Sequence, residues 1–345
     1  MAEKMRGMMY MAPGQLELME LPIPRVGADD VLVRIRKATT CGTDVKIYKR
    51  GHPVFLPPFC FGHELAGDVV AVGSNVKKFK PGMRVVPHNS APCGVCYYCK
   101  RGQHNMCGDL LFNWGAYAEY ILIPGRIANL NMFEIPDDIA YEQASIMEPF
   151  STVVHGQRVI QIQHGESVAI LGSGGPIGLM HLQMARLSGA SQVFAVDLKE
   201  PRLAVAARLG ATRTINANEE NPVQVIKDLT DGRGADVVIE SAGSKATWEQ
   251  AMQVARKGGR VLWFGGLPNG TVVNVDATIA HYSELSLYGV FHSTPQDVEA
   301  AYHLICNNVL DTKALITEEM PLENLKEALN KMIDGSVVKV AIRTE

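Results

Sequence analysis

Hydrophobic and polar residues alternate in short runs over the first 150 residues of the chain. VLVRIRKA at 31–38 and LAGDVVAVGSNV at 65–76 show this alternation, and proline and glycine interrupt it at short intervals. A period of two is typical of strands that bury one face. We therefore expect residues 1–150 to form a small, mostly antiparallel β domain.

The pattern changes at about residue 151, where wholly apolar runs alternate with longer, helix-like segments. The expected strands are SVAIL, QVFAVD, ADVVIES and GGRVLWFG, and the expected helices include PIGLMHLQMARLSGA and SKATWEQAMQVARKG. Such alternation predicts a doubly wound parallel sheet over 151–289. Residues 290–345 return to a mixed pattern, and their last run, VVKVAIRTE, is expected to rejoin the first domain as an edge strand.

Composition and charge narrow the possible functions. The 345 residues, 47% of them hydrophobic, suffice for two cores. The chain has 33 basic and 36 acidic residues, a net charge of -3, and no long run of one sign. It therefore lacks the basic stripe that would bind the phosphates of a nucleic acid, and we do not expect nucleic acid as a partner. The chain contains neither eighteen consecutive apolar residues nor a signal-peptide pattern. We expect a cytoplasmic protein that does not bind membranes.

Four cysteines gather in APCGVCYYCKRGQHNMC with the spacing C-x2-C-x2-C-x7-C: Cys93, Cys96, Cys99 and Cys107. This spacing puts four thiolates within reach of one tetrahedral zinc ion. A disulfide framework is the alternative, but the two-residue gaps disfavour local pairing. Four sulfur ligands leave no open position, so this zinc would be structural and would stabilise the local fold by on the order of 10 kcal/mol. Cys60 and Cys306 are expected to be free packing residues.

A glycine-rich turn follows SVAIL and precedes a helix, and an acidic residue ends the next strand. Glycines let backbone amides approach a pyrophosphate at a helix N-terminus, and a carboxylate about twenty residues further on accepts the ribose hydroxyls. NAD is therefore favoured over NADP, although Lys199 and Arg202 could soften the discrimination. One residue more than G-x-G-x-x-G allows predicts a bulge at the second and third glycines. The expected cofactor residues are Gly172, Gly174, Gly175, Pro176, Ile177, Gly178, Asp197 and Arg202.

A second metal site is suggested by Cys41 and by His63, because a thiolate and an imidazole are a good zinc pair. A carboxylate and an exchangeable water would complete an open, catalytic site. Each residue alone is ambiguous, since a single cysteine is more often core and a single histidine more often a hydrogen-bonded structural residue. Their occurrence together with the four-cysteine lobe favours the metal site.

At this point the chain resembles the zinc-dependent medium-chain dehydrogenases over essentially its whole length, nearest to the sorbitol and threonine dehydrogenase branches. The resemblance rests on Cys41-Gly42-Thr43-Asp44, Gly62-His63-Glu64, the four-cysteine lobe, Gly115-Ala116-Tyr117-Ala118-Glu119-Tyr120, Glu148-Pro149, the glycine-rich turn and Asp197. It implies an α/β protein with a GroES-like catalytic domain from 1–150 and 290–345 and a Rossmann domain at 151–289. It also implies a catalytic zinc held by Cys41 and His63, with Glu64 and Glu148 as carboxylates that ligate directly or through water.

The resemblance further implies a proton path and shows two departures. Thr43 matches the hydroxyl that receives the alcohol proton in the family. The next relay member is usually a histidine, but Lys46 stands there, and an ordinary lysine is already protonated at neutral pH. His52 is near in sequence and is a candidate substitute, although a histidine in a surface loop is the favoured alternative. His292 stands where polyol dehydrogenases commonly carry arginine, which puts polyol specificity in doubt.

We therefore expect a zinc-dependent oxidoreductase that transfers hydride between a secondary alcohol, a polyol or a sugar, and NAD. An L-threonine 3-dehydrogenase would use the same machinery, and a non-enzymatic zinc-stapled binding protein would not need Cys41, His63 and Glu148. A quinone reductase relative would lack both metal sets. The resemblance implies a homo-oligomer, a dimer or a homotetramer, with the segment TVVNVDATI as a candidate contact.

Overall fold

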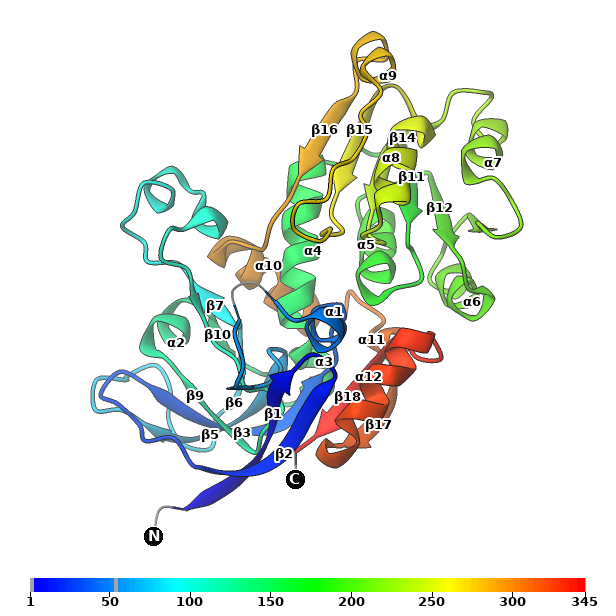
Figure 1. Cartoon of the computed structure of the whole chain (residues 1–345). Coiled ribbons are helices and arrows are strands. Elements are labelled where there is room, and N and C mark those ends of the chain that lie inside the picture. The colour runs from blue at the N-terminus through cyan, green and yellow to red at the C-terminus, as the bar shows by residue number, and fades with distance from the viewer. Residues whose placement is uncertain (1–2, 53–54, 345) are drawn as a thin grey trace. The chain divides into compact units, whose positions relative to one another are not determined.

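The computed structural model describes residues 3–52 and 55–344, so both chain ends of the expected first domain lie partly outside the described residues (Figure 1). The chain forms two compact units. One consists of the residues up to Ser151 together with those from Ser293, and the other spans Thr152–His292. Within the described residues, no helix has the length and apolar character that crossing a bilayer requires.

The first unit is built mainly from short strands. Its strands are β1 (Lys4–Ala12), β2 (Gln15–Pro22), β3 (Val31–Thr39), β4 (Phe59–Cys60), β5 (Leu65–Val72), β6 (Arg84–Pro87), β7 (Ser90–Ala91), β8 (Leu111–Phe112), β9 (Tyr120–Ile123), β10 (Met132–Glu134), β17 (Ile316–Pro321) and β18 (Lys339–Arg343). Its helices are α1 (Gly42–Arg50), α2 (Gly125–Asn131), α3 (Tyr141–Ser145), α10 (Pro295–Cys306), α11 (Thr312–Leu315) and α12 (Leu325–Asp334), with short 3-10 turns η1 (Cys99–Arg101), η2 (His104–Met106) and η3 (Leu322–Asn324). Helix α4 (Met147–Ile160) begins in this unit and continues into the second.

The largest sheet of the first unit has the order β10-β6-β5-β3-β18-β17, and β9 also pairs with β3. All these pairs are antiparallel except β17 with β18. The C-terminal run therefore does rejoin the first domain, but the expected edge position is wrong. Strand β18 is interior because β17 pairs with its other side, which was not apparent from the polar sequence ITEEMP.

The second unit holds a six-stranded sheet with β11 (Ser167–Leu171), β12 (Gln192–Asp197), β13 (Arg213–Asn216), β14 (Ala235–Glu240), β15 (Ala255–Trp263) and β16 (Ser286–Gly289). All strands are parallel, in the order β13-β12-β11-β14-β15-β16. The connecting helices are α5 (Pro176–Leu187), α6 (Glu200–Arg208), α7 (Pro222–Asp228), α8 (Lys245–Val254) and α9 (Ala277–Tyr282). The doubly wound parallel fold is thus confirmed.

Burial explains why the apolar runs form the centre of this sheet. Every residue of β11 is buried, as expected for a strand covered on both faces. One boundary differs from the prediction: helix α8 ends at Val254, and the following residues, expected to be helical, open β15. Ala255 pairs with Ala235 before the register shifts. Gly258 adopts a left-handed φ of 69°, which is incompatible with a continuing α-helix.

Candidate metal centre and dinucleotide site

Two segments of the first unit bring the three expected ligands Cys41, His63 and Glu64 together. Their ligand atoms all lie within 4.8 Å of one another, and all three residues are buried. Cys41 is the N-cap of α1, where its sulfur accepts the Thr43 amide at 3.4 Å. His63 and Glu64 directly precede β5, which pairs with β3 just before Cys41. The pairing of these two strands therefore assembles the donor set.

The ring of His63 is oriented by a buried carboxylate. Asp44 Oδ1 lies 3.1 Å from His63 Nδ1. The other oxygen of Asp44 accepts the Cys41 amide at 2.9 Å and the Tyr117 hydroxyl at 2.6 Å. A carboxylate on one ring nitrogen directs the other nitrogen toward a metal and fixes the tautomer. His63 Nε2 then faces Glu148 Oε2 at 3.7 Å.

Glu148 approaches the donor set from the first turn of α4 and is only 7% exposed. Burial raises the pKa of its carboxyl to about 7. Burial also raises the pKa of the Cys41 thiol. Carboxyl and thiol groups that are costly to ionise in a buried place are the groups that a cation would stabilise as anions.

Sequence reasoning missed one member of this site, Lys339 on β18. Its ammonium lies 2.6 Å from Glu64 Oε2, and its side chain is 1% exposed. Thr39 Oγ1 donates to the same oxygen, while Glu64 Oε1 has no hydrogen-bond partner among the described residues. The available signal was a single lysine within the apolar run VVKVAI. A sulfur, an imidazole nitrogen and a free buried carboxylate oxygen fit a zinc ion.

The four cysteines of the lobe also converge, with all four sulfurs within 4.8 Å of one another. None is in a disulfide, and the sulfurs of Cys96 and Cys107 are 3.9 Å apart. Backbone amides of Cys93 and Asp109 donate to Cys107 Sγ at 3.2 and 3.3 Å. Amide hydrogen bonds lower the pKa of Cys96 to about 6. This set fits a closed tetrathiolate zinc site.

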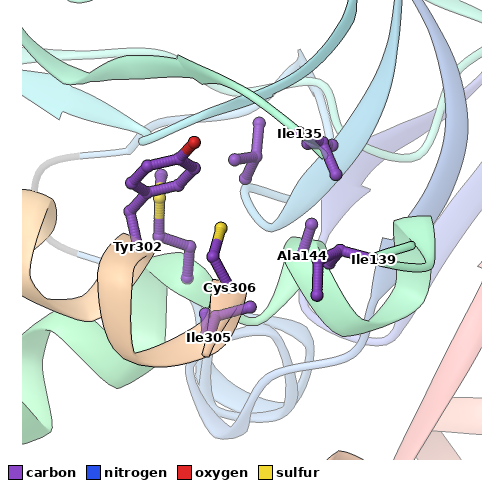
Figure 2. A pocket seen from close by; sticks show the side chains of 8 residues that line it. Ile135, Ile139, Ala144, Tyr302, Ile305 and Cys306 are labelled. Atoms are coloured by element: carbon purple, nitrogen blue, oxygen red, sulfur yellow. The ribbon is translucent and has the colours of Figure 1, made fainter. Parts of the chain in front are cut away.

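The remaining two cysteines differ in character from the clustered ones. Burial raises the pKa of Cys60 to about 11 and raises that of Cys306 as well. Cys306 lines an apolar pocket of the first unit, shown in Figure 2 with Tyr302 and Ile305 on α10. Raised pKa values favour the unreactive thiol form of both cysteines, and the apolar pocket around Cys306 agrees with a packing role.

The glycine-rich turn of the second unit has the geometry that each glycine requires. Gly172 adopts a φ of 81°, and a Cβ there would lie 2.6 Å from the Ala242 amide nitrogen. A Cβ at Gly178 would lie 2.4 Å from the Gly172 carbonyl oxygen. Gly175 caps α5, and Pro176 occupies the first turn of that helix. Backbone amides at a helix N-terminus are thereby left open to a pyrophosphate.

Asp197 ends β12 beside this turn. Its Oδ2 accepts the Gly174 amide at 2.8 Å, and its Oδ1 accepts the Leu198 amide at 2.8 Å. A Cβ at Gly174 would lie 2.4 Å from the Cβ of Arg202, so Arg202 of α6 also borders the turn. Lys199 is the N-cap of α6. The structure therefore brings the expected acidic residue and the glycine turn together.

The expected proton-path residues are placed less uniformly. Thr43 lies in the first turn of α1, next to Cys41 and partly buried, whereas Lys46 is exposed. His52 stacks on Phe55 with ring centroids 4.6 Å apart, and Phe55 contacts Trp114, which in turn contacts His63 at 4.9 Å. An aromatic wall thus borders the metal ligands. His292 belongs to the second unit and has a left-handed φ of 57°.

Comparisons with known proteins identify the family of the chain. The model of the alcohol dehydrogenase GroES-like domain matches residues 27–137, and that of the zinc-binding dehydrogenase matches 176–307. The chain is 34% identical to sorbitol dehydrogenase of Bacillus subtilis, over 92% of this chain and 91% of that protein. It is 36% identical to L-threonine 3-dehydrogenase of Symbiobacterium thermophilum, over 99% and 98% of the two chains.

Among solved structures, a zinc-binding dehydrogenase from Sinorhizobium meliloti bound to NADP superposes with a TM-score of 0.91 at 31% identity, and the match covers 99% of both chains. The GroES-like and Rossmann folds expected from the resemblance are thereby confirmed. The protein belongs to the zinc-dependent medium-chain alcohol dehydrogenases, a family of oxidoreductases that use a nicotinamide cofactor.

Proposed function

We propose that the protein is an NAD-dependent dehydrogenase of a secondary alcohol, with a polyol or a sugar as its substrate. The observation that carries the proposal is the buried donor set of Cys41, His63 and Glu64, which combines sulfur, nitrogen and oxygen ligands. Its mixed composition distinguishes it from the all-sulfur set of the lobe. Mixed sets with an open position are typical of catalytic zinc, and closed sulfur sets of structural zinc.

We assign the catalytic zinc to Cys41 and His63, with Glu64 and Glu148 as the carboxylates. When bound, zinc supplies a Lewis acid that polarises a substrate oxygen. Two neighbouring residues orient the proposed zinc ligands. Asp44 orients the His63 ring, and Lys339 binds one oxygen of Glu64. With the structural zinc of the lobe, the chain would carry two zinc ions.

Thr43 is proposed to take the proton that the substrate hydroxyl loses. The backbone amide of Thr43 donates to the Cys41 sulfur, so Thr43 lies in the same helical turn as this proposed metal ligand. Lys46 is not assigned a role because its side chain is exposed to solvent. His52 remains a proposed second member of the relay, supported by its ring contact with the aromatic wall.

NAD rather than NADP is proposed as the cofactor because the carboxylate of Asp197 borders the glycine-rich turn and would repel a 2′-phosphate. The Sinorhizobium relative carries NADP, so this preference is a matter for measurement on this chain. We further propose a cytoplasmic homo-oligomer, a dimer or tetramer, which analytical ultracentrifugation would test. A monomer at micromolar concentration would contradict this part of the proposal.

The substrate class is tested by NAD reduction rates with a panel of polyols, aldoses, simple secondary alcohols and L-threonine. We expect the highest kcat/KM with a polyol or a sugar. L-threonine 3-dehydrogenase activity is the second candidate, supported by the relative from Symbiobacterium, and it would need a site for the substrate ammonium and carboxylate groups. Highest kcat/KM with threonine would replace the polyol proposal, and no activity with any alcohol would contradict both.

A further inference from the structure

Glu240 is a buried carboxylate at the centre of the second unit that the proposed mechanism does not use. It is the last residue of β14 and is 0% exposed. In register it lies between Leu171 of β11 and Trp263 of β15. The strand order reverses between β11 and β14, and ligands of doubly wound sheets bind beside the carboxyl ends of the strands at such a point.

Glu240 binds two different loops at this edge of the sheet. Its carboxylate Oε1 accepts the Gly243 amide at 2.8 Å and the Thr247 hydroxyl at 2.7 Å, which anchors the loop after β14. Its carbonyl oxygen accepts the amides of Phe264 and Gly265 at 3.0 and 2.9 Å, which anchors the loop after β15. The two loops touch above the carboxylate, because a Cβ at Gly265 would lie 2.4 Å from the Gly243 nitrogen and 2.7 Å from Glu240 Oε2.

The loop after β14 is joined to the glycine-rich turn. The amide of Ser241 donates to the Leu171 carbonyl at 2.8 Å, and its hydroxyl lies 3.1 Å from the Gly172 carbonyl as a donor. Ala242 stands where a Cβ on Gly172 would collide. The position of the pyrophosphate-binding turn therefore depends on the loop that the Glu240 carboxylate holds.

We propose that Glu240 is a positioning residue for the dinucleotide. Its carboxylate holds the loop at 241–244 in the position in which that loop supports the glycine-rich turn for cofactor binding. The proposal rests on the proposed dinucleotide site. A carboxylate suits this task because charge-assisted hydrogen bonds are about twice as strong as neutral ones. Core packing alone would need no charge here, since burying a carboxylate is costly.

The test is NADH affinity and steady-state kinetics of Glu240→Gln, which keeps the shape of the side chain and removes its charge. Affinity is measured by fluorescence energy transfer from the stacked tryptophans Trp248 and Trp263 to bound NADH. Trp248 contacts the loop after β15, because its indole N–H donates to the Gly265 carbonyl at 2.8 Å. We expect Kd for NADH and KM for NAD to rise about tenfold, with kcat at saturating NAD near the wild-type value. Zinc content should not change.

The matched control is Glu249→Gln on α8, because Glu249 also binds a backbone amide, that of Asn274 at 2.8 Å, but Asn274 lies near the far end of the loop after β15, nine residues beyond Gly265. It should bind NADH as the wild type does. Thr247→Val removes the hydroxyl donor to the Glu240 carboxylate and should raise Kd by a smaller factor. This variant decides the matter if Glu240→Gln does not fold.

Wild-type affinity in a folded Glu240→Gln, or in Thr247→Val when Glu240→Gln is unfolded, would overturn the proposal. A lower kcat together with a lower thermal midpoint and an unchanged KM for NAD would also overturn it. That pattern is expected of a residue that only stabilises the fold. Failure of the underlying dinucleotide site looks different: the wild-type protein would then bind neither NADH nor NADPH.

Discussion

The ammonium of Lys339 and the carboxylate of Glu64 form an ion pair at 2.6 Å with side-chain exposures of 1% and 0%. The two residues are 275 positions apart in the sequence, and the C-terminal strand thereby contributes to the donor set near the start of the chain. A buried pair costs desolvation, but removing one partner leaves an uncompensated charge, which costs about 3–5 kcal/mol.

Lys339→Met should therefore lower the free energy of unfolding by about 3–5 kcal/mol and reduce zinc occupancy of the mixed site, since Glu64 loses the group that orients it. Urea denaturation and metal analysis measure the two effects. The double variant Lys339→Met with Glu64→Gln removes both charges and should recover much of the stability, though not the zinc. Unchanged stability and zinc content in Lys339→Met would contradict the role given to this pair.

Cys96→Ala leaves three sulfurs in the lobe and should release its zinc, at a cost of several kcal/mol from a site worth on the order of 10. We expect an earlier thermal midpoint and one zinc fewer for each chain. Cys60→Ala is the control because Cys60 is an inert thiol outside both donor sets. Retention of two zinc ions and of the wild-type midpoint in Cys96→Ala would contradict the structural role of the lobe.

Asp197→Asn should shift cofactor preference, because the amide keeps the size of the side chain but carries no charge that would repel a 2′-phosphate. We expect the ratio of kcat/KM for NAD to that for NADP to fall about tenfold. Glu200→Gln removes a carboxylate from the first turn of α6, where it binds Asn216 at 3.0 Å, and should leave the ratio unchanged. An unaltered ratio in Asp197→Asn would show that another group selects the cofactor.

Asp236 supports the pH dependence of stability in the second unit. Burial by itself would raise the pKa of Asp236, but hydrogen bonds from Ser167 and the Arg256 guanidinium at 2.6 Å outweigh it and lower the pKa. A pKa lower in the folded state than its unfolded value of about 3.9 means that the stabilisation is complete above that value. It is lost as the pH falls through the folded pKa.

Asp236→Asn should consequently lower the free energy of unfolding by about 1–3 kcal/mol at pH 7, and the difference from the wild type should shrink at acidic pH. Urea midpoints at several pH values measure this. Asp231→Asn, in an exposed pair with Arg233, should have little effect at any pH. A difference that grows as the pH falls would contradict the assigned sign.

Much of the fold and the convergence of the candidate ligands could be predicted because their signals are local in the sequence. The spacing of the four cysteines, the glycine-rich turn after SVAIL and the fully buried β11 each lie within about twenty residues. Local spacing determines which backbone groups and side chains a short segment can present together. The residues of the lobe and of the turn do converge in the structure.

The features that were missed depend on pairing between distant segments. Lys339 reaches Glu64 because β18 pairs with β3. Strand β18 is interior because β17 pairs with its other side. Alternation in VVKVAIRTE gives no information on either partner. The role of Glu240 likewise follows from the meeting of two loops, which the run ADVVIES does not reveal.

The central claim, that one zinc site performs chemistry and the other supports the fold, is tested most directly by measuring zinc content of the wild type and of Cys41→Ala together with turnover and NADH affinity. We predict two zinc ions in the wild type and one in Cys41→Ala, whose alcohol oxidation collapses while NADH binding stays close to the wild-type value. Near-normal turnover in Cys41→Ala, or a wild-type protein that holds only one zinc ion even after zinc supplementation, would contradict the account.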